Sequence, residues 1–181
     1  MPSLTTHRIS SLEARNQEIQ DELNLLIRTG SRNDEKFRWL TTSILALYDV
    51  ADWLQLDTTL ETVLGGRDNV DAARLYLWSI EPELALEFIR PAHELGKLQK
   101  RTLALSSSVC ETTRPCDYER IFEKQPSYAT SVAFVPISYQ KAQGVLTIGS
   151  FDPSHFSLSM STMFLDFLGE VIGRVVNKLV D

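Results

Sequence analysis

The stretch that most constrains the fold runs from residue 131 to residue 151, where two apolar segments flank a short polar turn. Proline cannot donate a hydrogen bond to a neighbouring strand, so Pro136 is expected at a strand end or a bulge. Gly144 is expected where the turn opens into the next strand. The pattern predicts an antiparallel hairpin with strands over residues 130–137 and 144–151.

The N-terminal part of the chain carries a second pattern, in which apolar residues recur in alternating steps of three and four. A sustained period of 3.5 residues is typical of a coiled coil, whose apolar side chains face a partner helix. Asn16 lies in this repeat where a buried polar residue favours two parallel helices, and Arg8 is placed to reach Glu13 of a partner helix. The residues predicted to form this dimer interface are Ile9, Leu12, Asn16, Ile19, Leu23, Leu26, Phe37 and Leu40.

Gly30 and Asn33 interrupt the repeat. Because glycine in a helix interior costs about 1 kcal/mol, we expect a kink or fraying near Gly30. The alternative to a coiled coil is an amphipathic helix that folds against its own domain. The expected organisation is a linker and dimerisation helix over residues 1–49, followed by a globular domain over residues 50–181.

Helices are expected near both ends of the globular part. A capping box formed by Thr58 and Glu61 predicts the start of a short helix, which ends at Gly65. A broad apolar stripe between residues 163 and 179 predicts the last helix. Helices at both ends of the chain can lie together on one face of a sheet.

The strands of the globular part are expected to pair as an antiparallel sheet, because hairpins link them. Alternating apolar residues predict strands over residues 71–80 and 84–90. The segment over residues 91–128 is mixed and is expected to cover the second face of the sheet. Within it we expect a helix over residues 93–101, a short strand over 102–105 and a helix over 117–124. The predicted fold class is therefore α+β.

Charge and composition exclude several classes of partner. A formal net charge of −6 argues against nucleic acid, because binding phosphates requires a basic face. No apolar run reaches the roughly 20 residues of a membrane span, and the N-terminus lacks the apolar core of a signal peptide. The two cysteines do not make a disulfide framework. We therefore expect a cytoplasmic protein with neither a nucleic-acid nor a membrane partner.

The hairpin, with its apolar-proline-apolar strand, turn and Gly-Val-Leu opening, resembles the central hairpin of GAF domains. GAF domains are small-molecule sensing modules of signalling proteins. The resemblance implies a GAF-like antiparallel sheet flanked by helices. A PAS domain, the nearest alternative, would normally place its helices between the second and third strands and end on strands, so the C-terminal helix favours GAF.

The C-terminal region is similar to the signature of a bacterial GAF-like family, domain-of-unknown-function family 484. The matching elements are residues 152–153, Phe156, Met160 and residues 162–165 and 168–170. Residues 12–16 and 33–34 resemble the linker helix of that family. Members usually carry a further helical segment before the linker, whereas this sequence starts almost at the linker. The family has no agreed activity, so the resemblance implies a fold and a sensor-like role.

No metal site or cofactor is indicated by the sequence. His7, His93 and His155 stand far apart, and none has metal-ligand spacing to a cysteine or carboxylate cluster. Gly65-Gly66 lacks the lysine of a phosphate-binding loop, and no Gly-x-Ser-x-Gly motif is present. The cofactor therefore stays unknown.

The alternative hypothesis, that the protein is an enzyme, depends on Cys110 and Cys116. Some GAF-fold enzymes reduce free methionine sulfoxide with cysteines in such loops, and the intervening Arg114 would favour a nucleophilic thiolate. In the other interpretation Cys110 is a small buried hydrophobic residue and Cys116 an incidental loop residue. Neither cysteine is followed by histidine, which argues against a covalent tetrapyrrole, and the Asn-Lys-Phe-Asp-Glu pattern of cyclic-nucleotide GAF domains is absent.

A ligand pocket is expected between the sheet and residues 91–128, because pockets favour covered concavities. The polar side chains predicted to line it are Arg90, His93, Tyr118, Tyr128, Ser131 and Thr147. The leading hypothesis is a non-catalytic regulatory or sensory module that forms a homodimer, binds a small molecule and signals to a separate partner protein. The alternatives are a thiol-dependent reductase and a structural adaptor with no ligand.

Overall fold

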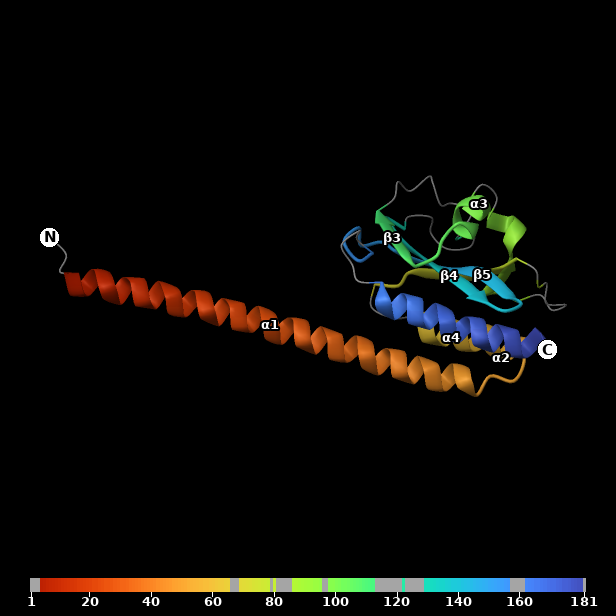
Figure 1. Ribbon diagram of the computed structural model, residues 1–181, viewed down its shortest axis with the longest axis horizontal. Coiled ribbons are helices and arrows are strands. Elements are labelled where there is room, and N and C mark those ends of the chain that lie inside the picture. The colour runs from red at the N-terminus through yellow and green to blue at the C-terminus, as the bar shows by residue number, and fades with distance from the viewer. Residues whose placement is uncertain are drawn as a thin grey trace. The chain divides into compact units, whose positions relative to one another are not determined.

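The computed structural model describes residues 4–65, 69–78, 80, 86–95, 98–112, 122, 129–156 and 162–180. The chain divides into two units, residues 1–41 and 42–181. Helix α1 (Leu4–Tyr48) belongs to the first unit over most of its length and is uninterrupted at Gly30 (Figure 1). The break expected there is therefore not formed. None of the helices in the described ranges is long and apolar enough to cross a membrane.

The second unit is the predicted α+β fold, built on one sheet (Figure 1). In the described part of the chain the strand order of this sheet is β2-β1-β5-β4-β3. After α1, the elements are α2 (Trp53–Leu64), β1 (Ala72–Leu77), β2 (Ile89–Pro91), the 3-10 helix η1 (Ala92–Leu95), α3 (Leu98–Leu103), β3 (Val109–Thr112), β4 (Ser131–Tyr139), β5 (Ala142–Ser150) and α4 (Met163–Val180).

The sequence predicted an antiparallel sheet, but one pair of strands is parallel. Its β3–β4, β4–β5 and β5–β1 pairs are antiparallel, but β1 and β2 run parallel, with Leu75 beside Ile89 and Tyr76 beside Arg90. A two-residue turn forces neighbouring strands to be antiparallel, whereas the longer connection over residues 78–88 does not. Of the second predicted strand, residues 84–85 lie outside the described residues, and β2 begins at Ile89, after residues 86–88.

The hairpin of β4 and β5 is the predicted one. Its strands pair from Ser131 with Ser150 to Tyr139 with Ala142, and Gln140 in the turn has a left-handed φ of 47°. The side chain of Asn177 on α4 holds this turn, because its oxygen accepts from the Lys141 N–H at 3.1 Å. The hairpin is thereby tied to the last helix.

Pro136 and Gly144 have other roles than those predicted. Pro136 lies inside β4, paired with Val145, rather than at a strand end or bulge. It is tolerated because it lies past Phe134, where the pairing of β4 with β3 ends, so no strand on that side needs its missing donor. Gly144 also lies within its strand, where a Cβ would collide with the carbonyl oxygen of Tyr76. Glycine is therefore needed for the close approach of β1 and β5.

Helix α2 begins six residues before the predicted capping box. Its N-cap is Asp52, whose carboxylate accepts from the Gln55 N–H at 2.8 Å. Thr58 lies inside the helix and donates to the carbonyl of Leu54 at 3.0 Å. The predicted stop at Gly65 is confirmed, since its N–H donates to the Glu61 carbonyl at 2.6 Å.

The carboxylate of Asp57 joins α2 to the edge of the sheet. Asp57 is 5% exposed, and its oxygens accept from the N–H groups of Glu87 at 3.2 Å, Phe88 at 2.9 Å and Ile89 at 2.8 Å. These bonds satisfy the backbone at the start of β2. They hold Arg90, the next residue, beside β1.

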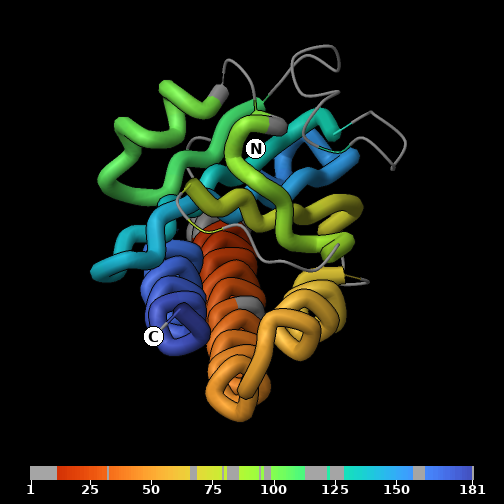
Figure 2. Tube along the Cα trace, turned by 90° about the vertical axis from the view of Figure 1, so that its right-hand side faces the viewer, coloured from red at the N-terminus to blue at the C-terminus, as the bar shows by residue number. Residues whose placement is uncertain are grey.

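Helices α2 and α4 lie on one face of the sheet, which we call the helix face; its strand residues include Leu75, Val135 and Leu146 (Figures 1 and 2). α4 packs on β4 so closely that a Cβ on Gly169 would lie 2.8 Å from the Pro136 carbonyl oxygen. The side chains of this face are buried, with Leu75, Val135 and Leu146 each 0% exposed.

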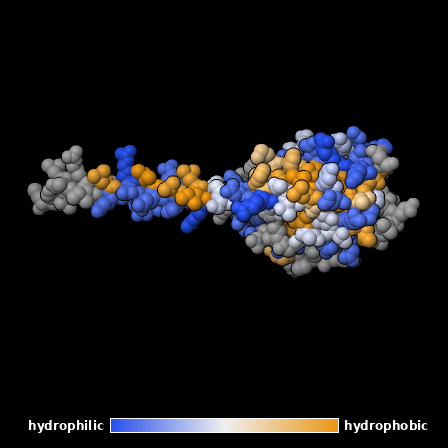
Figure 3. All heavy atoms as spheres, turned by 90° about the horizontal axis from the view of Figure 1, so that it is seen from below, coloured by the Kyte–Doolittle hydropathy of each residue, from blue (hydrophilic) through white to orange (hydrophobic). Residues whose placement is uncertain are grey.

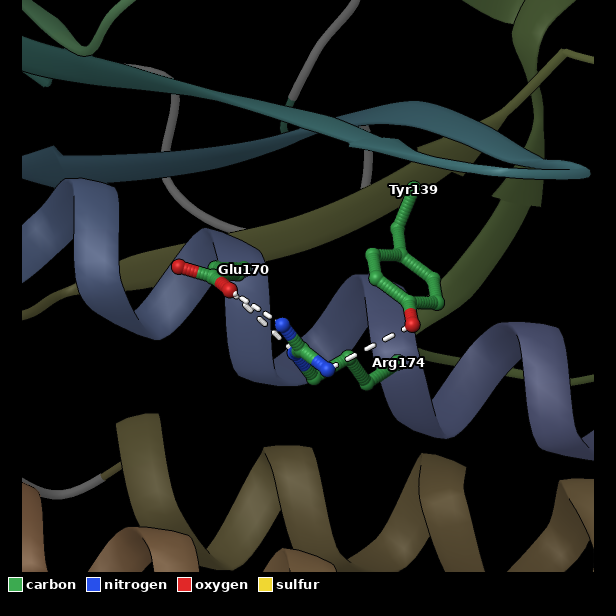
Figure 4. A network of polar contacts seen from close by, with 3 residues as sticks. All are labelled: Tyr139, Glu170 and Arg174. Carbon is green, nitrogen blue, oxygen red and sulfur yellow. Dashed lines mark hydrogen bonds and ion pairs between the residues drawn. The ribbon is translucent and has the colours of Figure 1, made fainter.

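A polar network on α4 ties the helix to the end of β4 (Figure 4). The Arg174 guanidinium donates to Glu170 at 2.7 Å and to the Tyr139 hydroxyl at 3.4 Å, and it stacks 4.6 Å from the Tyr139 ring centroid. The bond to Glu170 raises the pKa of the Arg174 guanidinium, which stays charged. Because these hydrogen bonds are exposed, they hold α4 against the end of β4 at the surface and do not form part of a buried site.

The mixed segment differs from its prediction. The helix expected over residues 93–101 is divided into η1 and α3, and residues 102–103 belong to α3 rather than to a strand. The helix expected over residues 117–124 lies outside the described residues apart from Phe122. Phe122, Leu95 and Ala129 belong to a cluster on the second face of the sheet.

Candidate functional site

The second face of the sheet, which we call the cluster face, carries an apolar cluster. Its strand residues are Ala72, Tyr76, Val132, Phe134 and Val145, all buried. Leu95, Phe122 and Ala129 pack over them, with Trp78 and Leu105 at the margin. In the described part of the chain, packed side chains thus occupy the middle of the face where the sequence predicted a pocket.

Strand register assigns the predicted site residues to faces, because directly paired residues point to the same side of a sheet. Thr147 pairs with Phe134 and therefore lies on the cluster face, whereas Ser131 pairs with Ser150 on the helix face. The structure thus separates Ser131 from Thr147.

The hydroxyl of Ser131 is engaged in a turn. It donates to the Asp152 carbonyl at 2.6 Å and accepts from the Phe156 N–H at 3.3 Å. Asp152 in turn accepts from the N–H and hydroxyl of Ser154 at 2.8 and 2.7 Å, which lowers the pKa of its carboxyl group. Ser131 therefore positions the loop that follows β5.

Thr147 and Arg90 share the cluster face. Thr147 is fully buried, and its hydroxyl donates to the Arg74 carbonyl at 3.2 Å. Arg90 lies beside Tyr76 and is partly buried. His93 is exposed on η1, and Tyr118 and Tyr128 lie outside the described residues. Of the six predicted pocket residues, the structure therefore places Thr147 and Arg90 on the same face, on strands separated by β1.

Arg74 was missed as a candidate site residue. It pairs with Thr147 on the cluster face, is partly buried, and donates to the carbonyl of Ala73 at 2.7 Å. The alternation in residues 71–80 indicates that Arg74 and Tyr76 lie on the same side of a strand. This pattern could have identified Arg74 as a candidate site residue. That Arg90 joins them depends on the parallel pairing of β1 and β2.

A second polar pair lies at the opposite edge of the cluster face. Arg101 on α3 donates to Glu111 on β3 at 2.6 Å, and its guanidinium carbon lies 5.8 Å from the Phe134 ring centroid. The charge of Arg101 is thus compensated within the chain. Within the described residues, neither Arg74 nor Arg90 has such a carboxylate partner.

Cys110 lies on the helix face, paired with Ala133, and is 4% exposed. Burial raises the pKa of its thiol, and the nearby Asp166 carboxylate raises it further. A nucleophilic cysteine needs the opposite, an accessible thiol with a lowered pKa. Cys116 lies outside the described residues. No property of Cys110 therefore favours the reductase hypothesis.

We expect Cys110 to react slowly with Ellman's reagent in the folded protein. In a Cys116→Ser variant, the rate at pH 8 should be at least about 100-fold lower than in denaturant, because the thiol is covered and protonated. The matched control is Cys110→Ser, which reports on Cys116 alone. Fast modification of Cys110 without loss of folded structure would contradict the burial described here.

No group of three His, Cys, Asp or Glu side chains within the described ranges is arranged to hold a metal ion.

The predicted dimer interface lies on α1, where Figure 3 shows apolar side chains interleaved with polar ones. Five of its residues are highly exposed in the single chain: Leu12 67%, Ile19 56%, Leu23 54%, Leu26 65% and Phe37 63%. Asn16 is exposed as well. Leu40 differs, because its side chain is only 6% exposed. The side chain of Ile9 lies outside what the structure describes.

A family model described as "Protein of unknown function, DUF484" matches residues 2–181 of the chain. No curated protein is similar enough to the chain to be matched to it.

Two bacteriophytochrome structures share the fold. The chromophore-binding domain of Stigmatella aurantiaca bacteriophytochrome in the Pr state is 14% identical with a TM-score of 0.51, over 79% of this chain and 60% of its own. The chromophore-binding domain of an unusual bacteriophytochrome from R. palustris is 9% identical with a TM-score of 0.51, over 82% of this chain and 62% of its own. The chain thus spans about three-fifths of each, and its fold is GAF-like.

A third structure is the free methionine-R-sulfoxide reductase from Neisseria meningitidis in complex with its substrate. It is 14% identical with a TM-score of 0.48, over 80% of this chain and 90% of its own. A likeness at this level supports no argument about activity.

Proposed function

The chain belongs to the family described as "Protein of unknown function, DUF484", and from this premise we propose that it is a non-catalytic regulatory module. In this proposal two copies pair through α1, the GAF-like unit binds a small molecule, and a separate partner protein in the cytoplasm reads the bound state. The observation that carries the proposal is the exposed apolar stripe of α1, defined as Leu12, Ile19, Leu23, Leu26 and Phe37.

A second helix packed against this stripe would stabilise α1. Isolated helices are marginally stable in water, and most helices are stabilised by packing an apolar face. Every described side chain between residues 12 and 35 is exposed, and Phe37 is 63% exposed, so the described residues leave the stripe uncovered. Its spacing of three and four residues suits a second copy of the same helix, which offers a matching stripe.

Asn16 and the charges at the start of α1 support parallel pairing. Asn16 interrupts the stripe at the position where a polar residue specifies a two-stranded parallel coiled coil. In the heptad pattern of the sequence, Arg8 and Glu13 occupy flanking positions that carry opposite charges, as parallel pairing requires.

The fold supports the ligand-binding part of the proposal. Both bacteriophytochrome domains with this fold are chromophore-binding domains, so a sheet and helices of this kind can hold a small organic molecule. In this chain the cluster face offers Arg90 and Arg74 beside an apolar centre. Ligand sites commonly combine an apolar wall with a few polar groups.

Signalling would follow from a shift between two arrangements of the paired α1 helices. A ligand changes such an equilibrium only if it binds one arrangement more tightly than the other. A partner protein that contacts one arrangement would then report ligand binding.

Native mass spectrometry of the purified full chain tests the proposal. We expect a dimer that carries an additional non-covalent mass, and a denaturing spectrum of the same sample should show the unmodified chain alone. A dimer of bare chain mass would instead favour the structural adaptor, and a monomer at micromolar concentration would remove the homodimer.

A further inference from the structure

Arg74 and Arg90 are diagonal neighbours on the cluster face. Leu75 pairs with Ile89, and the Leu75 N–H bonds to the Phe88 carbonyl at 3.1 Å, so Arg74 lies opposite Phe88. Arg90 is two residues further along β2 and points to the same face. From the strand spacing and rise, the two Cα atoms are about 8 Å apart. Two arginine side chains at this separation are long enough to meet at one small group.

This pair of positive charges lacks compensation in the described part of the chain. Both side chains are partly buried, and the bond that Arg74 makes there is to the neutral carbonyl of Ala73. Like charges on neighbouring strands are destabilising, and burial increases the cost. Arg101, the arginine at the other edge of the same face, contacts Glu111 at 2.6 Å.

We propose that Arg74 and Arg90 bind an oxyanion, the carboxylate or phosphate group of a small molecule. The proposal rests on the proposed function, since it names the ligand class of the same module. The planar guanidinium donates two parallel hydrogen bonds to such groups, which a lysine cannot do. The partly buried Trp78 at the margin of the apolar cluster lies on the same face and would contact the less polar part of the molecule.

Thermal unfolding of the full chain in added sodium phosphate or sodium succinate tests the proposal, with sodium chloride at equal ionic strength as reference. We expect at least one of the two anions to raise the midpoint by about 3 °C or more at saturating concentration. In the R74Q/R90Q variant the anion should no longer raise the thermal midpoint. The matched control R101Q should keep this increase, because Arg101 is already paired with Glu111.

If phosphate but not succinate raises the thermal midpoint, the bound group is a phosphate. If succinate but not phosphate raises it, the bound group is a carboxylate. In chloride alone R74Q/R90Q should melt no lower than the wild type, because it loses two uncompensated charges. An equal anion response in wild type and R74Q/R90Q, no response beyond chloride in the wild type, or a lower midpoint of R74Q/R90Q in chloride would each overturn the proposal.

Native mass spectrometry separates this inference from the proposed function. A non-covalent mass that R74Q/R90Q retains as fully as the wild type would leave the sensor in place and overturn the arginine site. Loss of that mass in R74Q/R90Q but not in R101Q would support both.

Discussion

Leu26→Asp should convert the proposed dimer into a monomer and raise its dissociation constant at least about a thousandfold. Leu26 is 65% exposed in the single chain and belongs to the stripe that we propose to face a second copy. Each dimer would lose two buried leucine side chains and gain two carboxylates in an apolar seam. Burial of one leucine is worth about 1.5–3 kcal/mol, so the pair accounts for about 4 kcal/mol, which is a thousandfold.

Leu25→Asp is the matched control, because Leu25 is 64% exposed on the same helix but lies outside the stripe. Light scattering after size exclusion, at several protein concentrations, should show a dimer for the wild type and for Leu25→Asp. The thermal midpoint of the GAF-like unit should be the same in both variants. Equal dissociation of the two variants would contradict the predicted seam, and a monomeric wild type would remove it altogether.

Asp57→Ala should destabilise the protein by about 3–5 kcal/mol. The substitution leaves the N–H groups of Glu87, Phe88 and Ile89 without their carboxylate acceptor at a buried position. Hydrogen bonds to charged groups contribute about 1.5–3 kcal/mol each, and three that share one acceptor do not add fully. For a chain of this length the loss corresponds to a drop of about 6–20 °C in the thermal midpoint.

Two further variants serve as comparisons for the loss of stability in Asp57→Ala. Asp57→Asn keeps one acceptor oxygen and should lose less stability than Asp57→Ala. Asp52→Ala removes the cap at the start of the same helix and should cost only about 1 kcal/mol. Chemical denaturation monitored by circular dichroism measures all three. If Asp57→Ala were no worse than Asp52→Ala, the bonds between α2 and β2 would not hold the edge of the sheet.

The α+β class, the hairpin and the terminal helices could be predicted because each follows from local patterns. Alternation with period 2 and apolar spacing of three and four residues depend only on which side chains must be buried. The cap of α2 was also within reach of the sequence. Asp52 and Gln55 have the spacing of a capping box, and the Thr58 and Glu61 pair matched the same pattern six residues too late.

The candidate site could be predicted only in part. Arg90 and Thr147 lie on one face, but the sequence also assigned Ser131 to that face. A strand has two sides, and the pairing register decides which side faces which layer. Ser131 and Thr147 belong to paired strands, so their opposite orientation became evident only when β4 and β5 were aligned residue by residue.

What the sequence alone determined is therefore the set of elements, together with the repeat that gives α1 its apolar stripe, because these depend on neighbours a few residues apart. What only the tertiary structure decided is which elements meet. The parallel pairing of β2 with β1 places Arg90 near Arg74. This pairing depends on contacts between residues far apart in the chain, whose free energy is set by the packed fold rather than by any local pattern.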